Sequence, residues 1–92
     1  MQITLTERFQ KDVNSLSTEE KNQLFSILLK LPAAIKNIHL HQGIGLRKIH
    51  SSGIYEARIG LNLRIIFGLD KNTAILHRAG NHDEIKRYLK NL

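Results

Sequence analysis

The chain has 92 residues, with 14 lysines and arginines against 8 aspartates and glutamates, a net charge of +6 and no cysteine. The lack of cysteine excludes disulfides and thiolate metal sites. No apolar run approaches the roughly 20 residues of a membrane span, and the amino terminus lacks the charged-then-apolar layout of a signal peptide. We therefore expect one domain over residues 1–92, located in the cytoplasm and without a membrane segment.

The first half of the chain predicts a short strand followed by two helices. Residues 2–5 alternate polar and apolar side chains, which is typical of a strand with one buried face. Thr6 is a suitable N-cap for a helix whose apolar residues recur at spacings of four and three. Ser17 or Thr18 caps a second helix, and Pro32 is predicted to end it because proline disfavours helical geometry at the residue before it. The two helices form a hairpin.

Residues 33–45 predict either a short helical turn or an irregular connection. His39 and His41 lie in this segment, but no cysteine and no carboxylate stands at a suitable spacing beside them. We therefore assign no metal site to the chain. Residues 46–50 predict the next strand, and residues 51–53 predict a hairpin turn.

The second half predicts an antiparallel meander and a final helix. Segments rich in Ile, Leu, Tyr and Phe, each closed by Gly or Asn, indicate strands over residues 54–60, 62–69 and 73–79. Residues 82–92 carry apolar side chains at helical spacing. The order β-α-α-β-β-β-β-α predicts an α+β fold, in which a helical hairpin packs on one face of a four- to five-stranded, mainly antiparallel sheet.

Strand periodicity assigns the meander side chains to two faces. Glu56, Arg58 and Arg64 point to the face that the helices leave open, where the arginines meet solvent or an anion because a charged side chain is costly to bury. The opposite, core-facing set consists of Tyr55, Ala57, Ile59, Leu63, Ile65 and Phe67.

The positive charge is concentrated in the predicted sheet. Residues 47–92 carry nine basic and four acidic side chains, whereas residues 1–46 are nearly balanced. A basic sheet face is typical of proteins that bind a polyanion, nucleic acid before membrane. A generic basic surface is the alternative interpretation.

Four motifs follow one another at characteristic spacings. They are Gly45-Leu-Arg-Lys48, Gly53-Ile-Tyr-Glu-Ala-Arg-Ile-Gly60, Leu63-Arg-Ile-Ile-Phe67, and the stretch from Ile75 to Glu84 with Tyr88 after it. In this order they resemble the RelE/ParE toxin superfamily, which consists of small basic proteins from bacterial and archaeal toxin–antitoxin pairs. The resemblance extends over essentially the whole chain and implies the RelE/ParE-like fold.

For the RelE branch, the resemblance implies the toxin of a type II toxin–antitoxin system. Such a toxin is a ribosome-dependent mRNA endonuclease (an mRNA interferase) that inhibits translation. The 2′-hydroxyl attacks the adjacent phosphate and the 5′-oxygen leaves, without a metal or another cofactor. The implied partners are a cognate antitoxin and mRNA on the ribosome, with contacts to 16S ribosomal RNA.

This chemistry needs cations for the charge of the phosphorane and groups that transfer protons. The resemblance assigns the phosphate clamp to Arg58 and Arg64, whose guanidinium groups offer bidentate geometry. His82 is the implied acid, with a pKa range that suits the task. Tyr88 stacks on a base or assists the proton transfer.

Glu56 departs from the RelE pattern, because that branch carries lysine at this position. The carboxylate is either the general base or a salt-bridge partner of the two arginines, and we favour the salt bridge. A mechanism that depends on two lysines therefore does not transfer to this chain. The residues expected to supply positive charge for RNA binding are Arg47, Lys48, His50 and Arg78.

Ordinary structural roles are the alternatives for the candidate residues. Arg64 pairs with Glu56 across strands, His82 stands in the first turn of a helix, and Tyr88 packs against the sheet edge. His77 is expected to be a half-buried strand residue rather than a ligand. Two further functions also remain open, because one fold serves several: a ParE-type toxin that poisons DNA gyrase by binding, and a non-toxic member that only binds its antitoxin.

Overall fold

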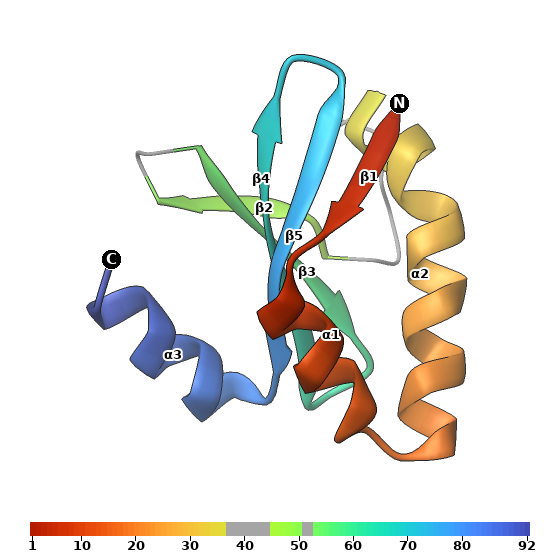
Figure 1. The fold of residues 1–92 in the computed structure, drawn as a ribbon, viewed down its shortest axis with the longest axis vertical. Coiled ribbons are helices and arrows are strands. Elements are labelled where there is room, and N and C mark those ends of the chain that lie inside the picture. Colours follow the sequence, from red (N-terminus) through yellow and green to blue (C-terminus); the bar gives the residue numbers. More distant parts are fainter. Residues whose placement is uncertain (37–44, 51–52) are drawn as a thin grey trace.

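The elements follow one another in the predicted order β-α-α-β-β-β-β-α (Figure 1). A computed structural model describes residues 1–36, 45–50 and 53–92. The predicted connection over 37–44, with His39 and His41, and residues 51–52 of the predicted turn lie outside the described residues. The elements are β1 (Gln2–Leu5), α1 (Glu7–Asn14), α2 (Thr18–Lys36), β2 (Arg47–His50), β3 (Ile54–Ile59), β4 (Leu63–Asp70), β5 (Thr73–Gly80) and α3 (His82–Lys90).

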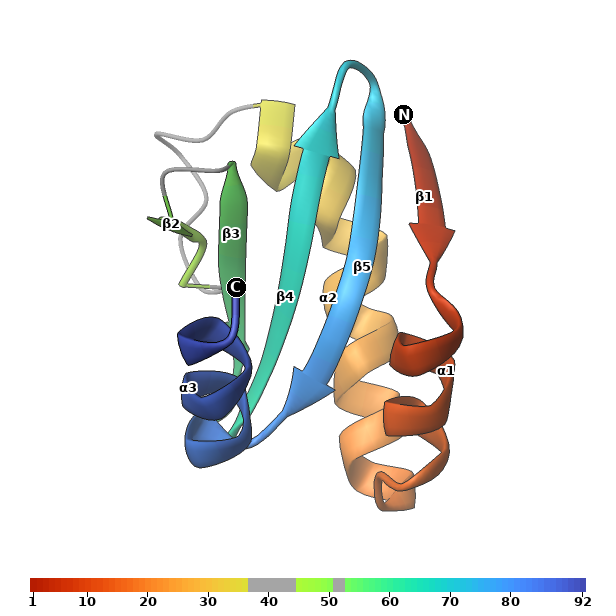
Figure 2. The ribbon, with the colours of Figure 1, turned by 60° about the vertical axis from the view of Figure 1, so that its left-hand side comes forward.

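The strands form one five-stranded sheet in the order β1-β5-β4-β3-β2. β1 pairs parallel to β5, and the other neighbours are antiparallel. The predicted mainly antiparallel sheet is therefore confirmed. α1 and α2 lie on one side of the sheet and α3 on the other, as the two ribbon views show (Figures 1 and 2).

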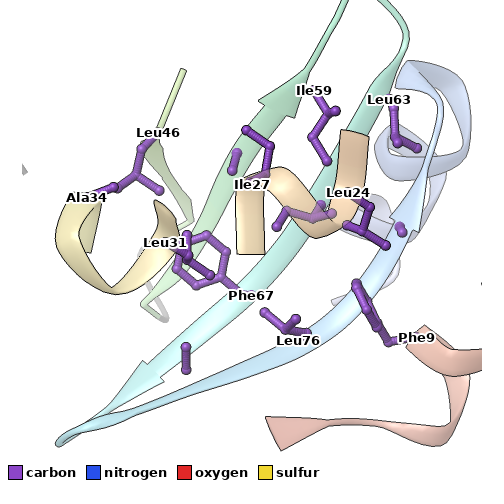
Figure 3. Close-up of a cluster of buried hydrophobic side chains, with 14 residues drawn as sticks. Phe9, Leu24, Ile27, Leu31, Ala34, Leu46, Ile59, Leu63, Phe67 and Leu76 are labelled. Carbon is purple, nitrogen blue, oxygen red and sulfur yellow. The ribbon is translucent and has the colours of Figure 1, made fainter. Parts of the chain in front are cut away.

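The core lies between the helical hairpin and the sheet. Side chains of α2 point toward the strands, and Phe9 of α1 joins them (Figure 3). Tyr55 stacks on Phe67 with ring centroids 5.7 Å apart. The side chains predicted to face the core do so: Ala57, Ile59, Leu63, Ile65 and Phe67 are buried, and the partly buried Tyr55 packs against them.

α2 continues through Pro32 to Lys36, so the predicted end of this helix at Pro32 is wrong. Proline removes one hydrogen bond from a helix interior. Leu31 and Ala34, on either side of the ring, are nevertheless both buried in the core. The apolar stripe of α2 continues past the proline, and burying it offsets the lost hydrogen bond.

Two capping boxes fix where α2 and α3 begin. Ser17 and Glu20 exchange backbone-to-side-chain hydrogen bonds at the start of α2. Asn81 and Glu84 do the same at the start of α3, which makes Asn81 the N-cap and His82 the first helical residue. No helix in the described ranges is long and apolar enough to cross a membrane.

Candidate functional site

Three arginines converge on the carboxylate of Glu56 in β3. Its Oε1 lies 3.0 Å from Nη1 of Arg64, 3.4 Å from Nε of Arg47 and 4.0 Å from Nε of Arg58. We call these four residues the Glu56 cluster. Three guanidinium groups around one carboxylate leave the cluster with a net charge of +2.

Strand register brings the cluster together. Arg58 and Arg64 are directly opposite each other in the β3–β4 ladder, and Arg47 is opposite Glu56 in the β2–β3 ladder. Directly paired residues of antiparallel strands project from the same face, which confirms that Arg58 and Arg64 share one face. Two like charges in this position repel each other. The carboxylate of Glu56 offsets that repulsion.

Glu56 lies on the predicted face of the sheet, but it is buried rather than exposed. Only 3% of the residue is exposed, so the expectation that it lies on an open surface is wrong. Part of this face is also covered by α3, because Ile66, on the same face of β4, and Ile85 of α3 are both buried. The guanidinium groups of the three arginines lie against the carboxylate and help to shield it from solvent.

The arginines of the cluster differ in their exposure to solvent. The side chain of Arg64 is 15% exposed, whereas that of Arg58 is 51% exposed. Gly45, which has a φ of +54°, lies against the aliphatic part of Arg58, since a Cβ there would be 3.3 Å from the Arg58 Cβ and Cγ atoms. In the described part of the chain, the buried Nε of Arg64 has no hydrogen-bond partner. The cluster thus combines the accessible guanidinium of Arg58 with the fixed guanidinium of Arg64, whose Nε is buried.

Three further candidate residues lie on α3 and β2. His82 is exposed in the first turn of α3. It stands two residues after Gly80, which is the register partner of Arg64. Within the described ranges, no hydrogen bond or ion pair joins His82 to the cluster. On β2, Lys48 is exposed on the opposite face from Glu56, because its register partner is the core-facing Tyr55. His50 is half-buried and makes contacts of its own.

Arg78 and Tyr88 form a second group with residues that sequence reasoning did not identify. The guanidinium carbon of Arg78 lies 5.6 Å from the centroid of the Tyr88 ring. The Nε of the same arginine donates to Asp12 Oδ2 at 2.7 Å, and the Asp12 carboxylate also accepts from the Ala79 N–H at 3.0 Å. Arg8 Nε is 3.7 Å from Asp12 Oδ1.

Only one part of this second group, the pairing within α1, can be recognised from the sequence. Arg8 and Asp12 are four residues apart and share a face of α1, as their spacing indicates. The pairing of Asp12 with Arg78 spans 66 residues and depends on how α1 packs on β5. Tyr88 was expected to stack on a base, to assist the proton transfer or to pack against the sheet edge. Its ring makes a cation–π contact with Arg78 of β5.

His77 occupies a bulge between β4 and β5. The register shifts between Ile66 and Phe67, and His77 is left without a partner across β4. The imidazole lies over Gly68, where an added Cβ would be 3.2 Å from its Nε2 atom. Desolvation by burial lowers the pKa of His77 from its ordinary value of 6.5. Its expected half-buried position in a strand is confirmed.

This lowered pKa predicts a pH-dependent contribution to stability. Between the folded-state pKa and 6.5, the unfolded chain binds more protons at His77 than the folded chain. The contribution is therefore complete above pH 6.5 and is lost as the pH falls from 6.5 through the folded-state pKa. We expect urea unfolding to show a larger loss of stability from about pH 7.5 to about pH 5 in the wild type than in His77→Gln. Equal losses in both proteins would contradict this assignment.

The structure thus has a helical hairpin on one face of a five-stranded sheet and the Glu56 cluster on the other. Among the described residues, no three His, Asp or Glu side chains are grouped as metal ligands would be. No protein-family model and no curated protein matches the sequence.

Solved toxin structures do match the fold. YafQ from Escherichia coli BL21(DE3) is 22% identical with a TM-score of 0.72, covering 90% of this chain and 94% of that one. A chain of the RelB–RelE antitoxin–toxin complex of Methanococcus jannaschii is 21% identical with a TM-score of 0.66, covering 92% and 96%. A chain of the YoeB dimer from Staphylococcus aureus is 21% identical with a TM-score of 0.68, covering 89% and 97%. At these identities the likeness establishes the fold, and the predicted RelE/ParE-like fold is confirmed.

Proposed function

We propose that this protein is the toxin of a type II toxin–antitoxin system and cleaves mRNA on the ribosome, which inhibits translation. The observation that carries the proposal is the Glu56 cluster, with its net charge of +2 on the sheet face opposite the helical hairpin. The fold shared with YafQ and with the RelB–RelE and YoeB structures supports it. Ribosome-dependent action places the protein in the cytoplasm.

The cluster suits an attack of the 2′-hydroxyl on the adjacent phosphate. Charge builds up on the phosphorane oxygens, and guanidinium groups held in advance stabilise it without reorganising during the reaction. Arg58 is accessible enough to bind a phosphate oxygen directly. Arg64, held by the carboxylate at 3.0 Å, adds a fixed positive charge. No metal ion or other cofactor takes part in this scheme.

Glu56 acts in this proposal as a positioning residue. A side chain that is 4% exposed is too buried to reach a 2′-hydroxyl. Its oxygen instead holds three arginines in place, so the salt-bridge interpretation is favoured over the general base. Removal of a proton from the 2′-hydroxyl therefore requires another group or water.

Residues around the cluster complete the proposed site. His82, exposed at the start of α3, is the acid that protonates the leaving 5′-oxygen. Arg47 and His50 of β2 bind the RNA strand, and Lys48, on the other face of the same strand, binds 16S ribosomal RNA. Tyr88 stacks on a base beside the scissile nucleotide, and Arg78, held by Asp12, supports the Tyr88 ring and adds positive charge to the RNA-binding surface.

A cognate antitoxin is the proposed protein partner. The RelB–RelE and YoeB–YefM structures that share this fold are toxin–antitoxin complexes. The net charge of +6 favours an acidic segment of the antitoxin, and exposed apolar side chains such as Phe25 and Leu29 offer it a hydrophobic contact.

The test is to express the protein briefly and to map mRNA 5′ ends by primer extension. We expect cuts at codon-defined positions in the wild type, reduced about 100-fold in His82→Ala because a general acid contributes at least that much. Asp83→Ala, the neighbouring exposed position, serves as the matched control and should cut normally. Intact mRNA with broken DNA would replace the proposal by gyrase poisoning, and harmless expression would replace it by a non-toxic, antitoxin-binding protein.

A further inference from the structure

α1 and α3 lie on either side of the carboxyl end of β5 (Figures 1 and 2), and side chains of these elements line two hollows there. One hollow of about 500 Å³ is lined by Thr6, Arg8, His77, Arg78 and Tyr88. A second, of about 320 Å³, is lined by Arg8, Arg78, Glu84, Arg87, Tyr88 and Asn91. Because the two hollows share three residues, we treat them as one feature, the α1–α3 groove.

We propose that the α1–α3 groove is a second binding site for single-stranded RNA, in which Arg8 of α1 and Arg87 of α3 hold backbone phosphates on either side of Tyr88. The inference rests on the proposed function, since it extends the path of the same RNA strand away from the Glu56 cluster.

The cations of the groove differ in whether they are free to bind a ligand. Arg78 is committed, because its two hydrogen bonds to Asp12 measure 2.7 and 3.4 Å and its side chain is 17% exposed. Arg8 is 64% exposed, and its 3.7 Å approach to Asp12 is too long for a hydrogen bond. It can turn from Asp12 to a phosphate at little cost.

The α3 side of the groove offers a second uncommitted cation. Within the described ranges no ion pair engages the exposed guanidinium of Arg87. Glu84, the acidic residue in the lining of the second hollow, accepts a hydrogen bond from the Asn81 N–H at 3.1 Å in the capping box. The groove therefore presents two available guanidinium groups, one from each helix.

The aromatic ring favours RNA over an acidic peptide as the ligand. An acidic peptide would bind the arginines without using the Tyr88 ring. The unpaired bases of RNA, in contrast, stack on aromatic side chains in sites of this kind. The groove and the Glu56 cluster are connected through β5. Arg78 lies two residues from Gly80, the register partner of Arg64, which is about 7 Å along β5.

The experiment measures binding without cleavage. A fluorescein-labelled, single-stranded oligoribonucleotide with 2′-O-methyl groups cannot be cut by 2′-hydroxyl attack, so its affinity is independent of catalysis. Fluorescence anisotropy at several salt concentrations gives the slope of log K against log[salt]. We expect Arg8→Ala and Arg87→Ala each to weaken binding and to reduce this slope by about 0.7, the loss of one phosphate contact to a single strand.

Matched controls come from the same two helices. Lys11 on α1 and Lys86 on α3 are exposed and line neither hollow, so Lys11→Ala and Lys86→Ala should keep the wild-type slope. Wild-type slopes in Arg8→Ala and Arg87→Ala, or no measurable binding by the wild type, would overturn the proposal. So would losses in these two variants that appear only with poly-glutamate as the probe. Failure of the proposed function is seen separately, as uncut mRNA in cells.

Discussion

Replacing Glu56 with alanine is expected to lower the free energy of unfolding by about 3 to 5 kcal/mol. The substitution leaves Arg64 mostly buried at 15% exposure without its counter-ion, opposite Arg58 of like charge. Losing one partner of a buried pair costs far more than the net contribution of that pair, because the remaining charge stays desolvated. Urea unfolding followed by circular dichroism measures the loss.

Two further variants separate this cause from a general effect of losing an acidic side chain. Asp70→Ala removes an exposed carboxylate at the end of β4 and should change stability by no more than about 0.5 kcal/mol. In the double variant Glu56→Leu with Arg64→Met, both charges are absent, and much of the stability should return. If Glu56→Ala were as stable as Asp70→Ala, the carboxylate would not be buried in solution as described.

Arg58→Ala is expected to reduce mRNA cleavage by about 100- to 1,000-fold, the range for removing one group that stabilises transition-state charge. Stability should change by less than about 1 kcal/mol, because the Arg58 side chain is 51% exposed and only 4.0 Å at closest from Glu56. Arg58→Lys should recover only part of the rate, since an ammonium lacks the bidentate fork. Cleavage of a defined mRNA in a reconstituted translation system measures the rate.

The structure shows why Arg58 gives a cleaner kinetic test than Arg64. Removing Arg64 takes away the 3.0 Å partner of a buried carboxylate, so lost activity would be mixed with lost folding. Lys71→Ala, at the turn between β4 and β5, provides the control for a lost positive charge away from the cluster. Cleavage by Arg58→Ala at the rate of Lys71→Ala would show that the cluster does not bind the scissile phosphate.

Much of the fold could be predicted because its signals are local. Alternation of apolar and polar side chains marks β3 and β4, and the same alternation assigns Arg58 and Arg64 to one face. Caps such as Thr6 and Asn81 act on backbone groups within three residues of themselves. These features depend on neighbours in the chain, so the sequence contains the information needed to recognise them.

The order of the elements, the faces of the strands and the concentration of basic charge in the sheet could therefore be read from the amino-acid sequence. Which charges pair depends on the packing of distant elements: Glu56 is a buried counter-ion, and Asp12 binds Arg78 across 66 residues. Packing also explains why α2 continues through Pro32 and why α3 covers part of the face that was expected to be open. Periodicity is set by backbone geometry one residue at a time, whereas burial and ion pairing depend on which elements pack together.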